Sequence, residues 1–193
     1  MKVLLFLLSS AALLAETYTI QPQPGSDFRL YIHKTGPIMG GKKHDFLFER
    51  YQGKLDYDAG APEKSRVDLT IDTASVVVKD DWVKQSQLKD IHDEAVGNNG
   101  LQASKHPRMR FVSTTIEKKP DGTFTARGTL TIRGIDKPAE VAVTLAAQAE
   151  RLTLTGSATV KLTDYGIKPP KAALGLVGTR NEMDVRFKVI AVK

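Results

Sequence analysis

Hydrophobic and polar residues alternate along most of this chain, with the two-residue period of a β-strand. The clearest example is FTARGTLTIRGIDKPAEVAVTL, residues 124–145, where two alternating runs meet at a turn that contains glycine. One face of the first run carries Phe124, Ala126, Gly128, Leu130 and Ile132, and the other carries threonine and arginine. Because alanine and glycine beside bulky groups leave volume unfilled, this face predicts either a packed core or the wall of a ligand cavity.

The same period predicts further strands, each bounded by turns rich in Gly, Pro, Asp or Lys. The predicted strands cover residues 17–20, 28–34, 43–48, 51–58, 65–73, 108–118, 123–133, 139–147, 152–162 and 183–192. Their apolar faces are expected to point inward and their charged faces into water. The fold class is therefore all-β, a closed antiparallel barrel or a sandwich, and the small inward residues favour a barrel with a lumen.

Two segments interrupt the strand pattern. Residues 81–104 place Trp82 and Leu88 at helical spacings before the breaker run GNNG, which predicts a helix that caps one end of the barrel. Residues 165–179 contain Pro169-Pro170, which forbids regular strand pairing, and are unusually apolar for a connection. This second segment is expected to be either a structural plug or a flap over a ligand.

The first residues resemble a secretory signal. A lysine at position 2 precedes an almost wholly apolar run, and Ala15 is followed by polar residues. The run is about 12 residues, shorter than the roughly 20 that a membrane-spanning helix needs. Residues 1–15 are therefore expected to be a cleaved signal peptide, with a retained apolar terminus as the alternative, and residues 16–193 one domain.

Composition narrows the possible functions. The chain has no cysteine, which excludes thiol chemistry and disulfides. The net charge of +6 comes from cations that are interspersed with acids rather than clustered, so the pattern does not indicate nucleic-acid binding. Transient contact with an anionic membrane surface stays open.

No motif indicates catalysis or a metal. The four histidines (His33, His44, His92 and His106) lack the spacings of metal ligands, and the nucleophile-elbow, phosphate-loop and dinucleotide-binding motifs are absent. Most acids lie on the polar faces of their strands, where a solvated role is the simpler interpretation. What remains is the shape of an apolar cavity, which binds by burying methylene groups and suits a long hydrocarbon chain.

Two segments carry a family resemblance. SKHPRMRFVSTTIE at residues 104–117 and GTLTIRGIDKPAEVAVTL at residues 128–145 resemble the YceI-like family. The strands YQGKL at 51–55 and VDLTIDTAS at 67–75, the helical segment 88–101 and the closing strand 187–191 extend the resemblance over nearly all of the mature chain. It implies an extended, lipocalin-like barrel with an apolar tunnel, carrying no family catalytic residue or metal.

The resemblance also implies a ligand and a compartment. Members are mostly exported, and some hold a polyisoprenoid, often with a quinone head. Tunnel-lining residues are expected to be Phe28, Leu30, Ile32, Phe46, Phe111, Phe124, Ala126, Gly128, Leu130, Ile132, Val185 and Phe187. The tunnel mouth is expected at Trp82, Leu88, Leu174 and Leu176.

This chain departs from the family where the ligand would be selected. The stretch KQSQL at 84–88 replaces the usual Arg-Asp pair, and residues 166–178 are more apolar than the usual connection. The leading hypothesis is a periplasmic or secreted carrier, monomer or homodimer, that needs no cofactor and encloses a polyisoprenoid or isoprenoid quinone. The alternatives are a fully packed structural or stress-response module and, third, an enzyme that acts on a lipid.

Overall fold

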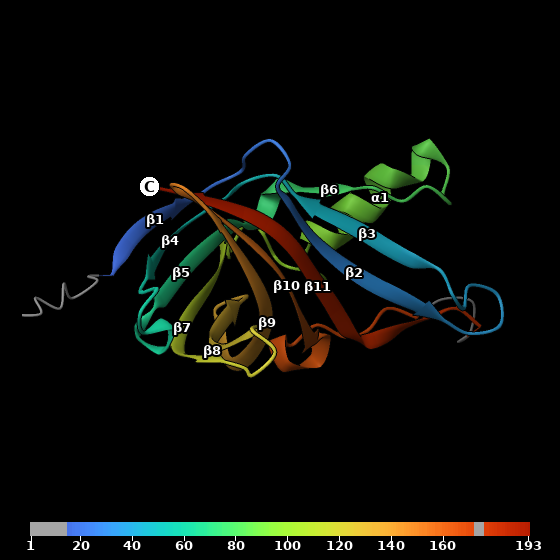
Figure 1. Ribbon diagram of the computed structural model, residues 1–193. Helices are drawn as coiled ribbons and strands as arrows, with labels where there is room; N and C mark the ends of the chain where they lie inside the picture. Colours follow the sequence, from blue (N-terminus) through green and yellow to red (C-terminus); the bar gives the residue numbers. More distant parts are fainter. Residues whose placement is uncertain (1–14, 172–175) are drawn as a thin grey trace, which may run out of the picture.

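The structure is a computed structural model that describes residues 15–171 and 176–193. Over these residues its strands form one antiparallel sheet (Figure 1). The strands are β1 (Glu16–Ile20), β2 (Asp27–Thr35), β3 (Lys43–Phe48), β4 (Tyr51–Tyr57), β5 (Arg66–Asp72), β6 (Val76–Val78), β7 (Arg108–Lys118), β8 (Phe124–Ile132), β9 (Ile135–Gln148), β10 (Arg151–Lys161) and β11 (Gly178–Val192). One α-helix, α1 (Gln85–Val96), and the 3-10 turns η1 (Pro62–Lys64), η2 (Thr73–Ser75) and η3 (Leu162–Tyr165) complete the described elements.

Eight strands close into a barrel in the order β1-β4-β5-β7-β8-β9-β10-β11. The closure is made by β11, which pairs with β10 along one edge and returns to β1 at the end of the other. In that last pairing Thr19 lies opposite Val192 and Ile20 opposite Ala191. The prediction of a closed antiparallel barrel is confirmed.

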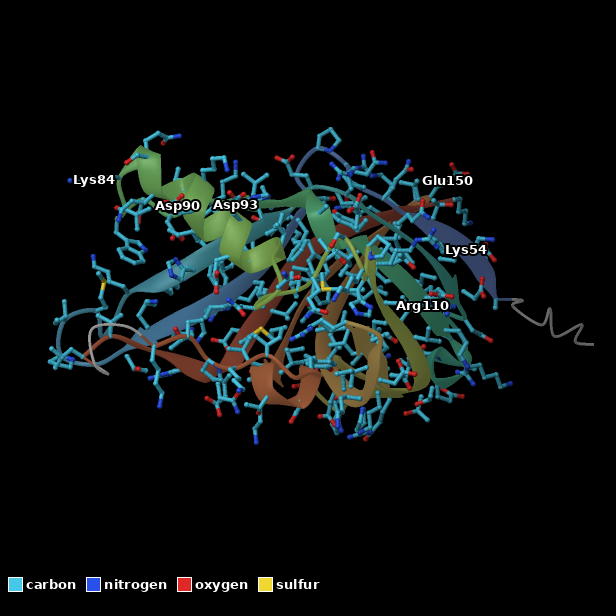
Figure 2. All side chains as sticks on the ribbon, turned by 180° about the vertical axis from the view of Figure 1, so that it is seen from behind. Lys54, Lys84, Asp90, Asp93, Arg110 and Glu150 are labelled. Carbon is cyan, nitrogen blue, oxygen red and sulfur yellow. The ribbon has the colours of Figure 1, made fainter. Side chains whose placement is uncertain are left out.

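A smaller sheet extends from the barrel. The first part of β11 pairs with β2, and β2 continues the sheet to β3 and β6. We call β2, β3 and β6 the wing. Helix α1 packs against β6 at this end of the molecule, with Leu88, Ile91, Ala95 and Val96 half-buried against the core (Figures 1 and 2).

The predicted faces of the strands are those observed. The buried core includes Phe28, Phe46, Ile71, Met109 and Val189, all from the inward side of their strands. Charged residues lie outside and pair across neighbouring strands. Arg110, for example, holds both carboxylate oxygens of Asp68 and lowers the pKa of that carboxyl.

Several element boundaries differ from the prediction. Strand β6 was not expected, because a run of three valines is too short to show a period. Strand β9 begins before its predicted start and contains Pro138. At Pro138 the strand pairs with β8 on one side and has no partner in β10 on the other. A strand with one neighbour tolerates proline. Helix α1 ends at Val96, directly before the GNNG run as predicted, but it begins at Gln85, and the rest of residues 81–104 forms bends and turns.

The described residues contain no helix that is both long and apolar enough to cross a membrane. Residues 1–14 of the expected signal peptide lie outside the described residues. The proposed cleavage after Ala15 therefore stays a prediction.

Candidate functional site

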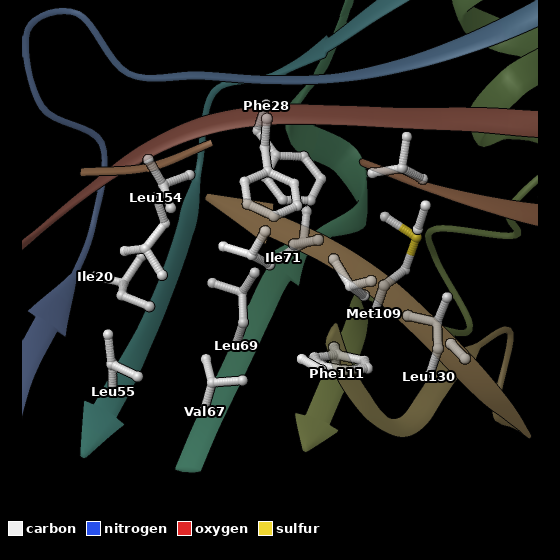
Figure 3. Close-up of a pocket in the computed structure, with 18 of the residues that line it drawn as sticks. Ile20, Phe28, Leu55, Val67, Leu69, Ile71, Met109, Phe111, Leu130 and Leu154 are labelled. Atoms are coloured by element: carbon white, nitrogen blue, oxygen red, sulfur yellow. The ribbon is translucent and has the colours of Figure 1, made fainter. Parts of the chain in front are cut away.

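The barrel encloses an apolar cavity of about 170 Å³. Among the described residues around it, Tyr57 and Ser65 are the two with a polar side-chain atom, and the rest are aliphatic, aromatic, methionine or proline. Figure 3 shows side chains from β1, β4, β5, β7 and β8 directed into the same space. Many of these inward side chains, Leu69, Phe111 and Leu130 among them, remain half-buried although they face the barrel interior. The lumen is therefore incompletely filled by protein.

The structure brings most of the sequence-predicted tunnel residues together. The wall of the barrel cavity includes Phe28, Leu30, Phe111, Phe124, Ala126, Leu130, Ile132, Val185 and Phe187. Ile32 and Phe46 instead line a second cavity at the wing. Sequence reasoning did not place Ile20, Leu55, Leu154, Val160 or Met183 on the wall, although all lie within strands.

Gly128 does not line either of these cavities, which corrects the expectation that it leaves free volume. A Cβ on Gly128 would lie 2.1 Å from the carbonyl oxygen of Val112 on β7. The pairing of β7 with β8 shifts register between Ser113 and Thr115, which is a β-bulge. Gly128 thus allows the bulged backbone of β7 to approach β8. The space that a side chain at position 128 would need is filled by the main chain of β7.

Aromatic rings pack at one side of the lumen. Phe28 stacks on Phe187 with ring centroids 5.7 Å apart, and its edge meets Phe48 at 6.3 Å. A Cβ on Gly156 would lie 2.4 Å from the ring of Phe187, so this glycine makes room for the ring rather than for a ligand. Gly128 and Gly156 therefore fit close packing, and the alanines that line the cavity are Ala126, Ala139 and Ala158.

A second cavity, about 300 Å³, lies between the wing, α1 and the segment after η3. Its floor is apolar and includes Ile32, Phe46, Val76, Ile91 and Ile167. Leu30, Phe48, Leu101 and Met183 line both cavities. These four side chains form the partition between them, and we call the second cavity the mouth.

Polar groups edge the mouth. Lys34, His44, Asp90 and Glu94 are among its lining residues, the first two from the wing and the last two from α1. Burial lowers the pKa of Lys34. The ammonium group of Lys34 has no ion-pair partner within the described residues. The mouth therefore contains a partly desolvated ammonium group beside an apolar floor.

His44 is held in place by a buried carboxylate. Its Nδ1 lies 2.5 Å from Oδ2 of Asp80, whose side chain is fully buried, and Oδ1 of Asp80 accepts a hydrogen bond from the Asp45 backbone N–H at 2.7 Å. With Nδ1 turned to Asp80, Nε2 is the nitrogen left for another partner. Lys34 and His44 share the inward face with Ile32 and Phe46, so strand alternation was the signal that could have found them.

Three of the four residues predicted for the mouth, Trp82, Leu88 and Leu176, do not line it. Trp82 donates its indole N–H to the Lys43 carbonyl at 2.8 Å and lies against the His44 ring, but it does not line the mouth. Leu88 packs half-buried against the core, and Leu176 is 50% exposed. Leu174 lies outside the described residues. The helix and the loop do border the mouth, through Ile91, Pro170 and their neighbours.

The segment after β10 closes part of the barrel. Tyr165 is 1% exposed, Ile167 is 5% exposed, and burial raises the pKa of the Tyr165 phenol to about 12. Gly166, at φ 68°, turns the chain, and its carbonyl accepts a hydrogen bond from Arg133 at 2.8 Å. For residues 165–167 of the predicted 165–179 segment, this burial fits the plug interpretation.

The histidines do not form a metal site in the described part of the chain, where no cluster of three candidate ligands occurs. His33 bonds to Asp184 at 3.0 Å on the outer face, while His44 faces the mouth. The two rings project to opposite sides because His33 and His44 differ by one position in register.

The fold and its cavities define a hollow, lipocalin-like barrel, an architecture whose interior is wide enough for one slim ligand. The chain belongs to the YceI-like domain family, whose model matches residues 18–191. Its curated relatives include a UPF0312 protein of Pseudomonas putida, 28% identical over 152 residues, which cover 76% of this chain and 72% of the relative. A UPF0312 protein of Pseudomonas syringae pv. tomato is 27% identical over 153 residues, covering 76% and 73%.

Solved structures share the fold. The crystal structure of BcnA from Burkholderia cenocepacia is similar with a TM-score of 0.71 and 20% identity, covering 88% of this chain and 98% of BcnA. A YCEI protein of Campylobacter jejuni gives a TM-score of 0.59 and 23% identity, covering 77% and 84%. The resemblance seen in the sequence is confirmed at the level of family and fold.

Proposed function

We propose that this protein is exported and holds one long apolar lipid, a polyisoprenoid or an isoprenoid quinone, for storage, transport or protection from stress. The observation that carries the proposal is the unfilled lumen with an almost wholly apolar wall. An engineered cavity of similar size lined by Leu, Ile and Phe stays dry and takes up apolar molecules. The lumen of about 170 Å³ therefore favours hydrocarbon over water. It does not fit the alternative of a fully packed module.

The two cavities suit a ligand with a tail and a head. Burying one methylene group gains about 0.8 kcal/mol, so each five-carbon isoprene unit in the lumen contributes up to roughly 4 kcal/mol. A chain too long for the lumen would pass the partition and reach the mouth. There Lys34 is placed to donate to a carbonyl or phenolate oxygen, and Nε2 of His44 is placed to accept from a hydroxyl.

Mass spectrometry of an organic extract from the purified protein tests the proposal. The expected result is about one isoprenoid per chain, recovered again after the stripped protein is incubated with an isoprenoid quinone. A stripped protein that takes up neither a quinone nor a polyprenol would refute it. N-terminal sequencing of the secreted protein tests export, and the expected first residue is Glu16.

A further inference from the structure

The free end of the wing carries exposed apolar side chains. Ile38, in the turn between β2 and β3, is 61% exposed, and Leu176, just before β11, is 50% exposed. They are the two large hydrophobic side chains that are exposed in the described part of the chain. A single exposed apolar residue is ordinary, but two on distant segments whose backbones meet indicate a contact surface.

The two segments do meet. A Cβ on Gly36 would lie 2.3 Å from the carbonyl oxygen of Leu176, so the two backbones are in contact. The Gly40 N–H donates to the Gly36 carbonyl at 2.8 Å, which folds the turn tightly and leaves Ile38 within it. Figure 1 shows this turn at the extreme end of the wing, away from the closed barrel. We call Pro37, Ile38, Met39 and Leu176 the tip.

The two stretches of sequence that carry the tip contain cations and no acids. Residues 34–43 and 166–180 contain no Asp or Glu, and their cations are Lys34, Lys42, Lys43, Lys168, Lys171 and Arg180. Among the described residues none of these six forms an ion pair. Lys42 and Lys43 lie over the rings of Trp82 and Tyr31 instead. Elsewhere, cations such as Arg110, Lys119 and Lys193 are paired with acids.

The neighbouring helix limits how this end of the molecule can meet a charged surface. α1 carries Asp90, Asp93 and Glu94, of which Asp93 is paired with Lys89 (Figure 2). Asp90 and Glu94 face the mouth. An anionic surface would repel this side of α1 and attract the tip, so the charge distribution favours contact through the tip.

We propose that the tip docks on an anionic lipid bilayer, with Ile38 and Leu176 entering the interface and the cations of these two stretches contacting lipid headgroups. Exposed apolar side chains on segments that also carry lysine and arginine match the two layers of a bilayer surface, whereas an acidic protein or a nucleic acid would leave the apolar pair unused. Lys34, Pro170 and Thr179 of the adjoining segments line the mouth on the side away from the acids of α1, so docking brings that side of the mouth toward the membrane. This role rests on the proposed lipid binding and specifies where the lipid is exchanged.

Sedimentation of the purified protein with vesicles tests the docking. We expect binding to phosphatidylcholine mixed with phosphatidylglycerol, loss of that binding at high salt, and at least tenfold weaker binding to phosphatidylcholine alone. The double variant Lys42→Gln/Lys171→Gln should bind about 30-fold more weakly, at about 1 kcal/mol for each cation near an anionic surface. Ile38→Asp is exposed enough to fold normally and should weaken binding at least tenfold.

The matched control is Lys54→Gln/Lys64→Gln, which removes the same net charge away from the tip (Lys54 is labelled in Figure 2). It should bind vesicles within about twofold of the unchanged protein, since a charge beyond the roughly 10 Å Debye length contributes little. Equal weakening by the two double variants, or unchanged binding by Ile38→Asp, would overturn the docking proposal. So would preference for an acidic protein over the anionic vesicles.

Lipid content separates this proposal from the proposed function. Tip variants that lose vesicle binding but keep a stoichiometric isoprenoid support docking as a distinct property. Unchanged vesicle binding by the tip variants, with an isoprenoid present, refutes docking and leaves lipid binding intact. Tip-dependent vesicle binding by a protein that takes up no isoprenoid supports docking and refutes the lipid-carrier function.

Discussion

Replacing Ala158 by leucine distinguishes a hollow barrel from a packed one by the sign of the stability change. Ala158 lies on β10 opposite Val185, lines the lumen and is half-buried. The substitution adds three carbon atoms. If the lumen takes them up, their burial gains up to about 2.4 kcal/mol at about 0.8 kcal/mol per carbon. Ordering the leucine side chain offsets about 0.5–1 kcal/mol of this gain.

A packed interior predicts the opposite result. Inserting extra methylene groups into a filled core costs about 1–3 kcal/mol. The assay is urea unfolding of the stripped protein, supported by thermal unfolding, in which 1 kcal/mol moves Tm by about 2–4 °C at this chain length. Ala158→Leu should also reduce the isoprenoid recovered per chain, because the side chain occupies part of its site.

Gly128→Ala serves as the control for a position without space. Its added carbon would lie 2.1 Å from the Val112 carbonyl oxygen, so the backbone of β7 must shift. We expect a loss of at least about 1 kcal/mol whether or not lipid is bound. If Ala158→Leu is destabilised as strongly as Gly128→Ala, and the slope of unfolding free energy against urea concentration is unchanged, the lumen is full and has no space for a ligand.

Three further substitutions test other features. Burial lowers the pKa of Lys34, so just below pH about 10.4 the folded state binds fewer protons than the unfolded chain and the free energy of unfolding rises with pH. Lys34→Met should therefore stabilise the protein at neutral pH. Urea unfolding should show that this gain in stability shrinks as the pH approaches about 10.4. The pKa of Tyr165 is raised to about 12, so stability should fall as pH rises from 10 to 12, and Tyr165→Phe should remove that fall in the same assay. Ser113→Ala leaves the Val67 N–H, now bonded to the Ser113 hydroxyl at 2.9 Å, without its partner and should cost about 1–3 kcal/mol in equilibrium unfolding.

Alternation was sufficient to predict the barrel wall. Residues 43–48 and 108–118 were predicted with the bounds that the structure gives β3 and β7. The reason is physical, since a strand with one face in the lumen and one in water must alternate, and a shift by one residue would bury its charges. The same reasoning placed Phe111 and Leu130 on the wall without knowledge of strand order.

The parts that failed depend on which elements meet. Gly128 looked like free volume because the bulge in β7 that fills its place depends on the pairing of two strands. The mouth was assigned to Trp82 and Leu88 by their position in the helical segment, whereas its polar side chains come from the wing and from other positions of α1, Asp90 and Glu94. The sequence showed that the inward face of β2 continues to Lys34. It did not show that α1 lies across this face.

Strand β11 runs along both the lumen and the mouth. It completes the barrel at β1 and begins the wing at β2, with Val185 and Phe187 on the lumen, Met183 at the partition and Thr179 at the mouth. From Met183 to Lys188 the strand is paired on both sides, with β10 and β2, so it cannot open the partition there without breaking ladder hydrogen bonds. Leu101 is the partition residue that belongs to no strand, and it follows α1, a helix with no fully buried side chain. We therefore propose that passage of the proposed lipid between the cavities would depend on movement of Leu101 with α1, while the barrel stays closed.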